Sequence, residues 1–67
     1  MFWLKVGNRE VTGKGGRVRA LDVSTGAELF NGTPAAAHRA ADTEADRPYA
    51  RALWAVATAE LYRGVQL

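Results

Sequence analysis

The chain has no cysteine and a single histidine, and these two absences exclude several kinds of site. Without cysteine, neither a disulfide nor a thiolate zinc site can form. One histidine cannot build a histidine-rich metal site either. No apolar run approaches the roughly 20 residues that span a bilayer, and the first residues lack the basic segment and long apolar core of a signal peptide. We therefore expect a cytoplasmic protein with no metal, no cofactor and no membrane contact.

What is present describes a small globular domain. The chain has 67 residues, of which 48% are apolar and 24% are charged, which is ordinary for a folded domain. A domain of this size buries only about 60% of the surface that its unfolded chain exposes, so small folds usually need additional stabilisation. Because disulfides and metal are excluded, self-association is the most direct source that remains. The aromatic residues supply surface for such a contact.

Strands are expected in the first half of the chain. Phe2, Leu4 and Val6 alternate with other side chains, which is the period of a half-buried strand. The pair Gly7-Asn8 suits a type II′ hairpin turn, because the first central residue of that turn needs a positive φ. Further strands are predicted, in order, over residues 9–12, 17–23 and 27–30.

Two features interrupt this β segment. The glycine-rich stretch 13–16 predicts an exposed, mobile loop, because glycine loses much chain entropy when it is ordered. The apolar alternation of the next strand changes phase at Ala20 and Leu21. That change predicts either a bulge at this point or a strand that is covered on both faces.

The second half predicts two helices. Thr33 can cap the first helix, over residues 35–45, and Pro34 suits its first position. Pro48 breaks the helical pattern, so a second helix is expected to begin after a cap at Asp46.

The second helix is expected to run to Arg63, with Gly64 ending it. Its apolar residues form a stripe at helical spacing: Ala50, Leu53, Trp54, Ala57 and Leu61. We expect this stripe to pack on the sheet face that carries Phe2, Leu4 and Val6.

The predicted fold class is therefore α+β, a three- or four-stranded antiparallel β-meander followed by two α-helices, with the amphipathic second helix packed on the sheet. We expect one domain over residues 1–67. The meander would occupy residues 1–32 and the helical part residues 33–67.

Catalytic motifs are weak throughout the chain. His38 and Asp42 lie four positions apart on a predicted helix, which is more typical of an exposed helix pair than of a general base. The glycine stretch lacks the Walker spacing and is followed by a strand, whereas phosphate loops lead into a helix. The carboxylates of Asp42, Glu44 and Asp46 scatter around a helix and do not converge. We predict no catalytic residue and no enzyme activity.

Two surfaces are candidates for binding. Exposed aromatic residues often anchor protein interfaces, and the candidates here are Trp3, Phe30 and Tyr62. Basic residues on and beside the glycine-rich hairpin could contact a phosphate backbone: Lys5, Arg9, Lys14, Arg17 and Arg19. We predict a non-catalytic protein-interaction or regulatory module that self-associates. The alternative is an accessory protein that binds nucleic acid through the basic hairpin.

Overall fold

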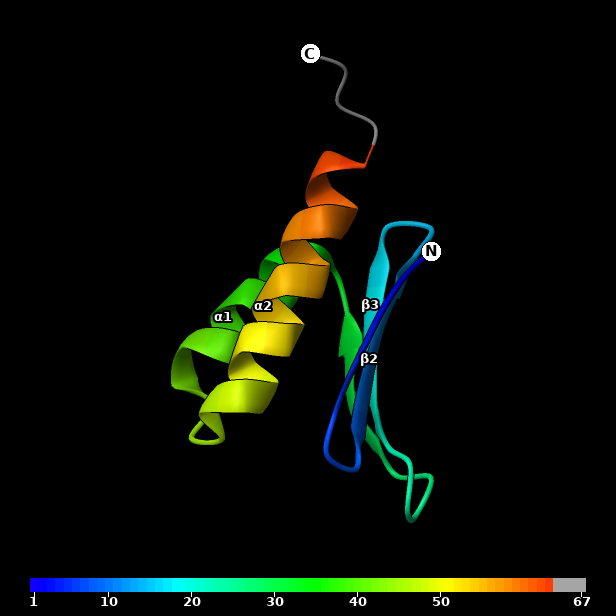
Figure 1. The fold of residues 1–67 in the computed structure, drawn as a ribbon. Helices are drawn as coiled ribbons and strands as arrows, with labels where there is room; N and C mark the ends of the chain where they lie inside the picture. Colours follow the sequence, from blue (N-terminus) through cyan, green and yellow to red (C-terminus); the bar gives the residue numbers. More distant parts are fainter. Residues whose placement is uncertain (64–67) are drawn as a thin grey trace.

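A computed structural model describes residues 1–63 and confirms the α+β prediction. Four antiparallel strands form one sheet in the order β1-β2-β3-β4, and two helices follow and cover one face of it (Figure 1). The elements are β1 (Phe2–Val6), β2 (Arg9–Lys14), β3 (Arg17–Asp22), β4 (Glu28–Gly32), α1 (Pro34–Thr43) and α2 (Arg47–Tyr62). The other face of the sheet, called the outer face below, carries neither helix.

Two tight turns connect the first three strands. Gly7 has a φ of 58°, as the first central residue of a type II′ turn requires, which confirms that prediction. Gly15 and Gly16 both have positive φ, which is the type I′ pattern. The loop predicted over residues 13–16 is therefore shorter than expected, although Gly15 and Gly16 are exposed as predicted. Gly13 and Lys14 belong to β2, and the remaining two glycines suffice to reverse the chain.

A bulge interrupts the pairing of β3 with β4. Ala20 pairs with Phe30, but Leu21 pairs with Glu28, so Leu29 is an extra residue on β4. Of the two explanations for the phase change in this strand, the structure contains the bulge. It lies on the edge strand that is followed by α1.

Both helices begin at the predicted caps. The Thr33 hydroxyl accepts a hydrogen bond from the N–H of Ala36 at 3.2 Å, and the Asp46 carboxylate accepts one from the N–H of Tyr49 at 3.4 Å. These bonds satisfy backbone donors that have no partner within a helix. Gly64, the predicted end of the second helix, lies outside the described residues.

The core is narrow and consists largely of small side chains. Its largest fully buried members are Leu53, Val11, Val18 and Val56, with alanines filling most of the rest. Helix α2 crosses β1, β2 and β3, while α1 packs beside it and over β3 and β4. Phe2 and Val6 pack against this core, as predicted for their face of the sheet.

The prediction that Trp54 and Leu61 of α2 pack on the sheet was wrong. Trp54 is 50% exposed and Leu61 is 47% exposed. The helix instead buries Leu53, Val56, Ala57 and Glu60.

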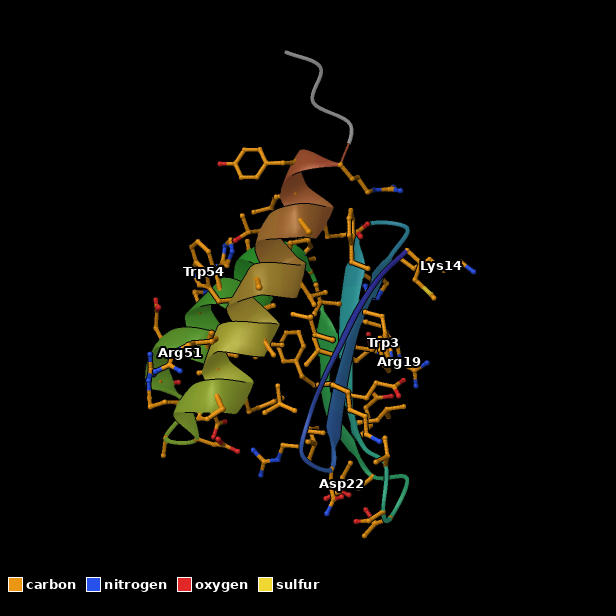
Figure 2. The ribbon with its side chains drawn as sticks, in the orientation of Figure 1. Trp3, Lys14, Arg19, Asp22, Arg51 and Trp54 are labelled. Atoms are coloured by element: carbon orange, nitrogen blue, oxygen red, sulfur yellow. The ribbon has the colours of Figure 1, made fainter. Side chains whose placement is uncertain are left out.

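Helix α2 approaches the sheet closely at Gly13. A Cβ atom at that position would lie 2.9 Å from Cγ1 of Val56, so the helix comes close to β2 and leaves no room for an indole. The Trp54 ring contacts His38 of α1 instead, with 5.2 Å between ring centroids. Figure 2 shows Trp54 on the side of the helices that faces away from the sheet.

No helix within residues 1–63 combines the length and the apolar character that a membrane crossing needs.

Candidate interaction surface at the free edge of the sheet

Strand β1 is an edge strand with an open side. Within residues 1–63 it pairs with β2 alone, in an unbroken register from Phe2 opposite Gly13 to Val6 opposite Arg9. It contains neither a bulge nor a proline, and Lys5 is its one charged side chain of the kind that protects an edge. Trp3 is 52% exposed and Leu4 is 42% exposed. Apolar side chains therefore accompany unpaired backbone groups along this edge.

An apolar groove of about 230 Å³ lies between this edge and α2. Phe2, Trp3 and Leu4 form one wall, and Ala55, Val56 and Ala59 form the other. Two of the three helix residues are alanines, so the helix wall projects little into the groove. A partner side chain could therefore enter beside Leu4.

The opposite edge of the sheet is built differently. Strand β4 carries the bulge at Leu29, and α1 follows it directly. A bulge twists an edge strand and breaks its hydrogen-bonding pattern, which opposes pairing with another strand. The two edges are therefore unequal, and β1 is the one that can accept a further strand.

The three aromatic residues predicted for an interface lie in different places. Trp3 lies on the outer face of β1 (Figure 2). Phe30 is half-buried and packs against the core beneath the helices. Tyr62 is exposed in the last turn of α2. Of the three, Trp3 alone belongs to the β1 edge and its groove.

Four of the five predicted basic residues share the outer face of the sheet. They are Lys5, Lys14, Arg17 and Arg19, and the strand register places Thr12 between Trp3 and Arg19. Figure 2 shows Trp3, Lys14 and Arg19 on the side away from the helices.

The two arginines of this group are held by side chains of β4. The guanidinium of Arg17 donates to Oδ1 of Asn31 at 2.9 and 3.2 Å. Arg19 forms an ion pair with Glu28 at 2.9 Å. Asn31 is neutral, so Arg17 keeps its full charge on this face, whereas Arg19 is partly neutralised.

Arg9 lies apart from this group. Its guanidinium pairs with the Asp46 carboxylate at 3.0 Å and lies 4.8 Å from the ring centroid of Tyr49. Both contacts tie β2 to the start of α2, so Arg9 supports the fold at the inner face.

Burial raises the pKa of the Tyr49 hydroxyl above its usual 10.0, and the nearby Glu44 carboxylate acts in the same direction.

Glu60 is a buried carboxylate that was not predicted from the sequence. It is buried, and its Oε1 accepts hydrogen bonds from the Gly16 N–H at 2.6 Å and from Nε of Arg63 at 2.9 Å. Its Oε2 is buried without a hydrogen-bond partner among residues 1–63. The signal was its spacing, since Glu60 follows Val56 by four positions and so shares its helix face. The carboxylate anchors the β2–β3 turn to α2.

His38, considered above as part of a general-base pair, makes a contact between the two helices. Nε2 of His38 lies 2.8 Å from Oγ1 of Thr58, which joins α1 to α2. Two hydrogen bonds from Ser24, through its hydroxyl and its N–H, hold the pKa of Asp22 below its usual 3.8, and this residue is the last of β3. The described part of the chain contains no group of three or more residues that could hold a metal ion.

A scan against protein-family models and searches of curated proteins and solved structures found no match to this chain. The fold and the surface at the β1 edge are therefore what the molecule offers for inferring its function.

Proposed function

We propose that this protein is a non-catalytic, self-associating interaction module, and that the β1 edge with its apolar groove is the binding surface. The observation that carries the proposal is the combination of an open, regular strand edge with two exposed apolar side chains, Trp3 and Leu4. An edge of this kind favours pairing with another chain.

The small size of the core supports the same proposal. Its fully buried large side chains are one leucine and three valines, whereas both tryptophans are about half exposed. Much of the apolar surface that a domain of this size could bury is therefore still in contact with water. An association that covered Trp3 and Leu4 would add to the stability of the fold by removing apolar area from water.

The experiment is a measurement of molar mass by light scattering over a range of protein concentrations. We expect the wild-type mass to rise above that of one chain as concentration increases. Leu4→Arg should return the mass to that of a monomer, because it places a charge in the apolar groove. A wild-type mass of one chain at every concentration would contradict the proposal.

Leu29→Arg is the matched control. Leu29 has nearly the same exposure as Leu4, 40% against 42%, and lies on the other edge strand. The chemical change is identical in the two variants, so a general effect of charge on solubility would affect both. The proposal requires that only Leu4→Arg disrupts the association.

A second candidate function is nucleic-acid binding on the outer face, which the clustering of four cations around Trp3 favours. The face carries Lys5, Lys14, Arg17 and Arg19 against Glu10 and Glu28, a charge of 4 − 2 = +2. Basic side chains contact phosphates, and an exposed indole can stack on an unpaired base.

This candidate is tested by a gel-shift titration with single-stranded and duplex DNA at several salt concentrations. The double variant Lys14→Glu with Arg17→Glu should remove a salt-sensitive shift. The control is Arg39→Glu with Arg51→Glu, which changes the net charge equally at two exposed helix positions. Absence of a shift at low salt, or equal loss in both double variants, would overturn nucleic-acid binding by this face.

A further inference from the structure

The turn between β1 and β2 determines which backbone groups of β1 are unpaired. Gly7 and Asn8 form a two-residue turn, so Val6 and Arg9, the residues that flank it, exchange backbone hydrogen bonds. Hydrogen-bonded pairs alternate along an antiparallel ladder. Leu4 and Phe2 therefore also bond to β2, whereas the backbone groups of Trp3 and Lys5 point to the open edge.

This alternation limits how a second copy of β1 could pair with the first. In an antiparallel pair related by a two-fold axis, the outward residues Trp3 and Lys5 must face outward residues of the other copy. Three registers satisfy that condition, with Trp3, Leu4 or Lys5 on the axis. A register shifted by one residue would also move each apolar side chain to the wrong face of the joined sheet.

Charge and length select one of the three registers. With Lys5 on the axis, two ammonium groups would lie directly opposite each other, which is unfavourable. With Trp3 on the axis, the pairing would extend past the start of the strand to Met1 and leave Val6 without a partner. With Leu4 on the axis, all five residues of β1 are paired, and each Lys5 lies opposite a Trp3.

We infer that two copies of this chain join through β1 in an antiparallel pair with Leu4 on the two-fold axis. This inference rests on the proposed function and names the partner as a second copy. Trp3 and Lys5 of each copy exchange backbone hydrogen bonds across the axis. The ammonium group of each Lys5 lies beside an indole of the other copy, where a cation–π contact is favourable.

The side chains beneath the joined sheet fit this arrangement. The two Leu4 side chains form a non-hydrogen-bonded pair, in which opposite residues lie closest together. They meet at the mouths of the two grooves, whose helix walls contain Ala55 and Ala59. These small side chains leave space between the two α2 helices for the leucines. Phe2 lies opposite Val6 at both ends of the pair.

Cysteine cross-linking tests the register, because the natural chain has no cysteine. The Leu4→Cys variant places two sulfurs across the axis. The two Cα atoms of a non-hydrogen-bonded pair lie about 4.5 Å apart, which is within the range that a disulfide can bridge. In a glutathione redox buffer, at concentrations where the wild type is dimeric, we expect covalent dimer to form on the order of a hundredfold faster than for Leu29→Cys. Circular dichroism of both variants verifies that they are folded.

A mixture provides the second arm of the experiment. Equal amounts of Trp3→Cys and Lys5→Cys should give the mixed covalent dimer, identified by mass, in preference to either single-variant dimer. Preferential dimerisation of Trp3→Cys alone, or of Lys5→Cys alone, would overturn the register. If light scattering shows association but Leu4→Cys and Leu29→Cys cross-link equally, self-association stands and the β1 pairing fails. A monomer by light scattering removes both.

Discussion

Replacing Gly13 by alanine tests how closely α2 approaches the sheet. The added Cβ would lie 2.9 Å from Cγ1 of Val56 and 3.0 Å from Oε2 of Glu60. Both distances are shorter than ordinary van der Waals contact, so the helix or the strand must shift. Overpacking of this kind costs about 1–3 kcal/mol.

An opposing effect must be included in the expected magnitude. Alanine restricts the unfolded chain more than glycine does, which stabilises a protein by about 0.4–1 kcal/mol where the backbone conformation permits it. The φ of Gly13 is not positive, so this gain applies. We expect the clash to dominate and the free energy of unfolding to fall by roughly 1–2 kcal/mol. That is a large share of the roughly 3–10 kcal/mol typical of a domain of this length.

The assay is urea unfolding of the variants at one fixed protein concentration, because association adds to the apparent stability. A double-mutant cycle with Val56→Ala identifies the contact, since shortening Val56 relieves the clash. The Gly13→Ala change should cost less in the Val56→Ala background by about 1 kcal/mol. If Gly13→Ala is as stable as the wild type, or if the two changes are additive, the close approach of α2 to β2 is refuted.

Three further predictions concern the core, the turn anchor and the effect of pH. Leu53→Ala should lower the free energy of unfolding by about 2–5 kcal/mol. The loss should exceed that of Trp54→Ala, since the leucine is buried and the tryptophan is half exposed. Urea unfolding that reverses this order would contradict the packing of α2. Glu60→Ala should cost about 1.5–3 kcal/mol, as for hydrogen bonds to charged groups, and should speed hydrogen exchange at the Gly16 amide; an unchanged exchange rate there would disprove the anchor. Because the pKa of Asp22 is lowered, its carboxylate stabilises the fold above pH 3.8, and this contribution is lost as the pH falls through the lowered value. The stability difference between wild type and Asp22→Asn should therefore shrink on acidification. A difference that is constant with pH would rule this out.

Local signals in the sequence were sufficient for the fold class. Thr33 and Asp46 are side chains that cap helices, and both do so in the structure. The alternation around Leu4 and the glycine of the first turn likewise depend on neighbours in the chain, and they specified the first hairpin. Such features could be read from the sequence because the interactions that cause them span only a few residues.

What the sequence did not reveal depends on contacts between distant residues. The close approach of α2 to β2 depends on Gly13, which lies more than 40 positions away from Val56 and Glu60. A helix that contacts both a sheet and another helix has a wide buried surface, so an apolar stripe does not specify which side chains are fully covered. Trp54 therefore looked like a core residue although it packs on His38.

The β2–β3 turn shows the same limitation. Three glycines within four residues indicated a loop over the whole stretch, but Gly13 belongs to β2 and the other two form a tight turn whose Gly16 N–H donates to the buried Glu60. The candidate surface was predictable in part. Trp3 was identified as exposed, whereas the groove beside it exists only because Ala55 and Ala59 of a distant helix lie next to β1.

Hydrogen exchange at individual amides of β1 tests most directly whether this edge pairs with a second copy. The amides of Trp3 and Lys5 point to the open edge, whereas the Leu4 amide bonds to β2 within the same chain. With rising protein concentration, the Trp3 and Lys5 amides should become protected while Leu4 remains protected throughout. Exchange of Trp3 and Lys5 at the rate of exposed amides at every concentration would contradict the pairing.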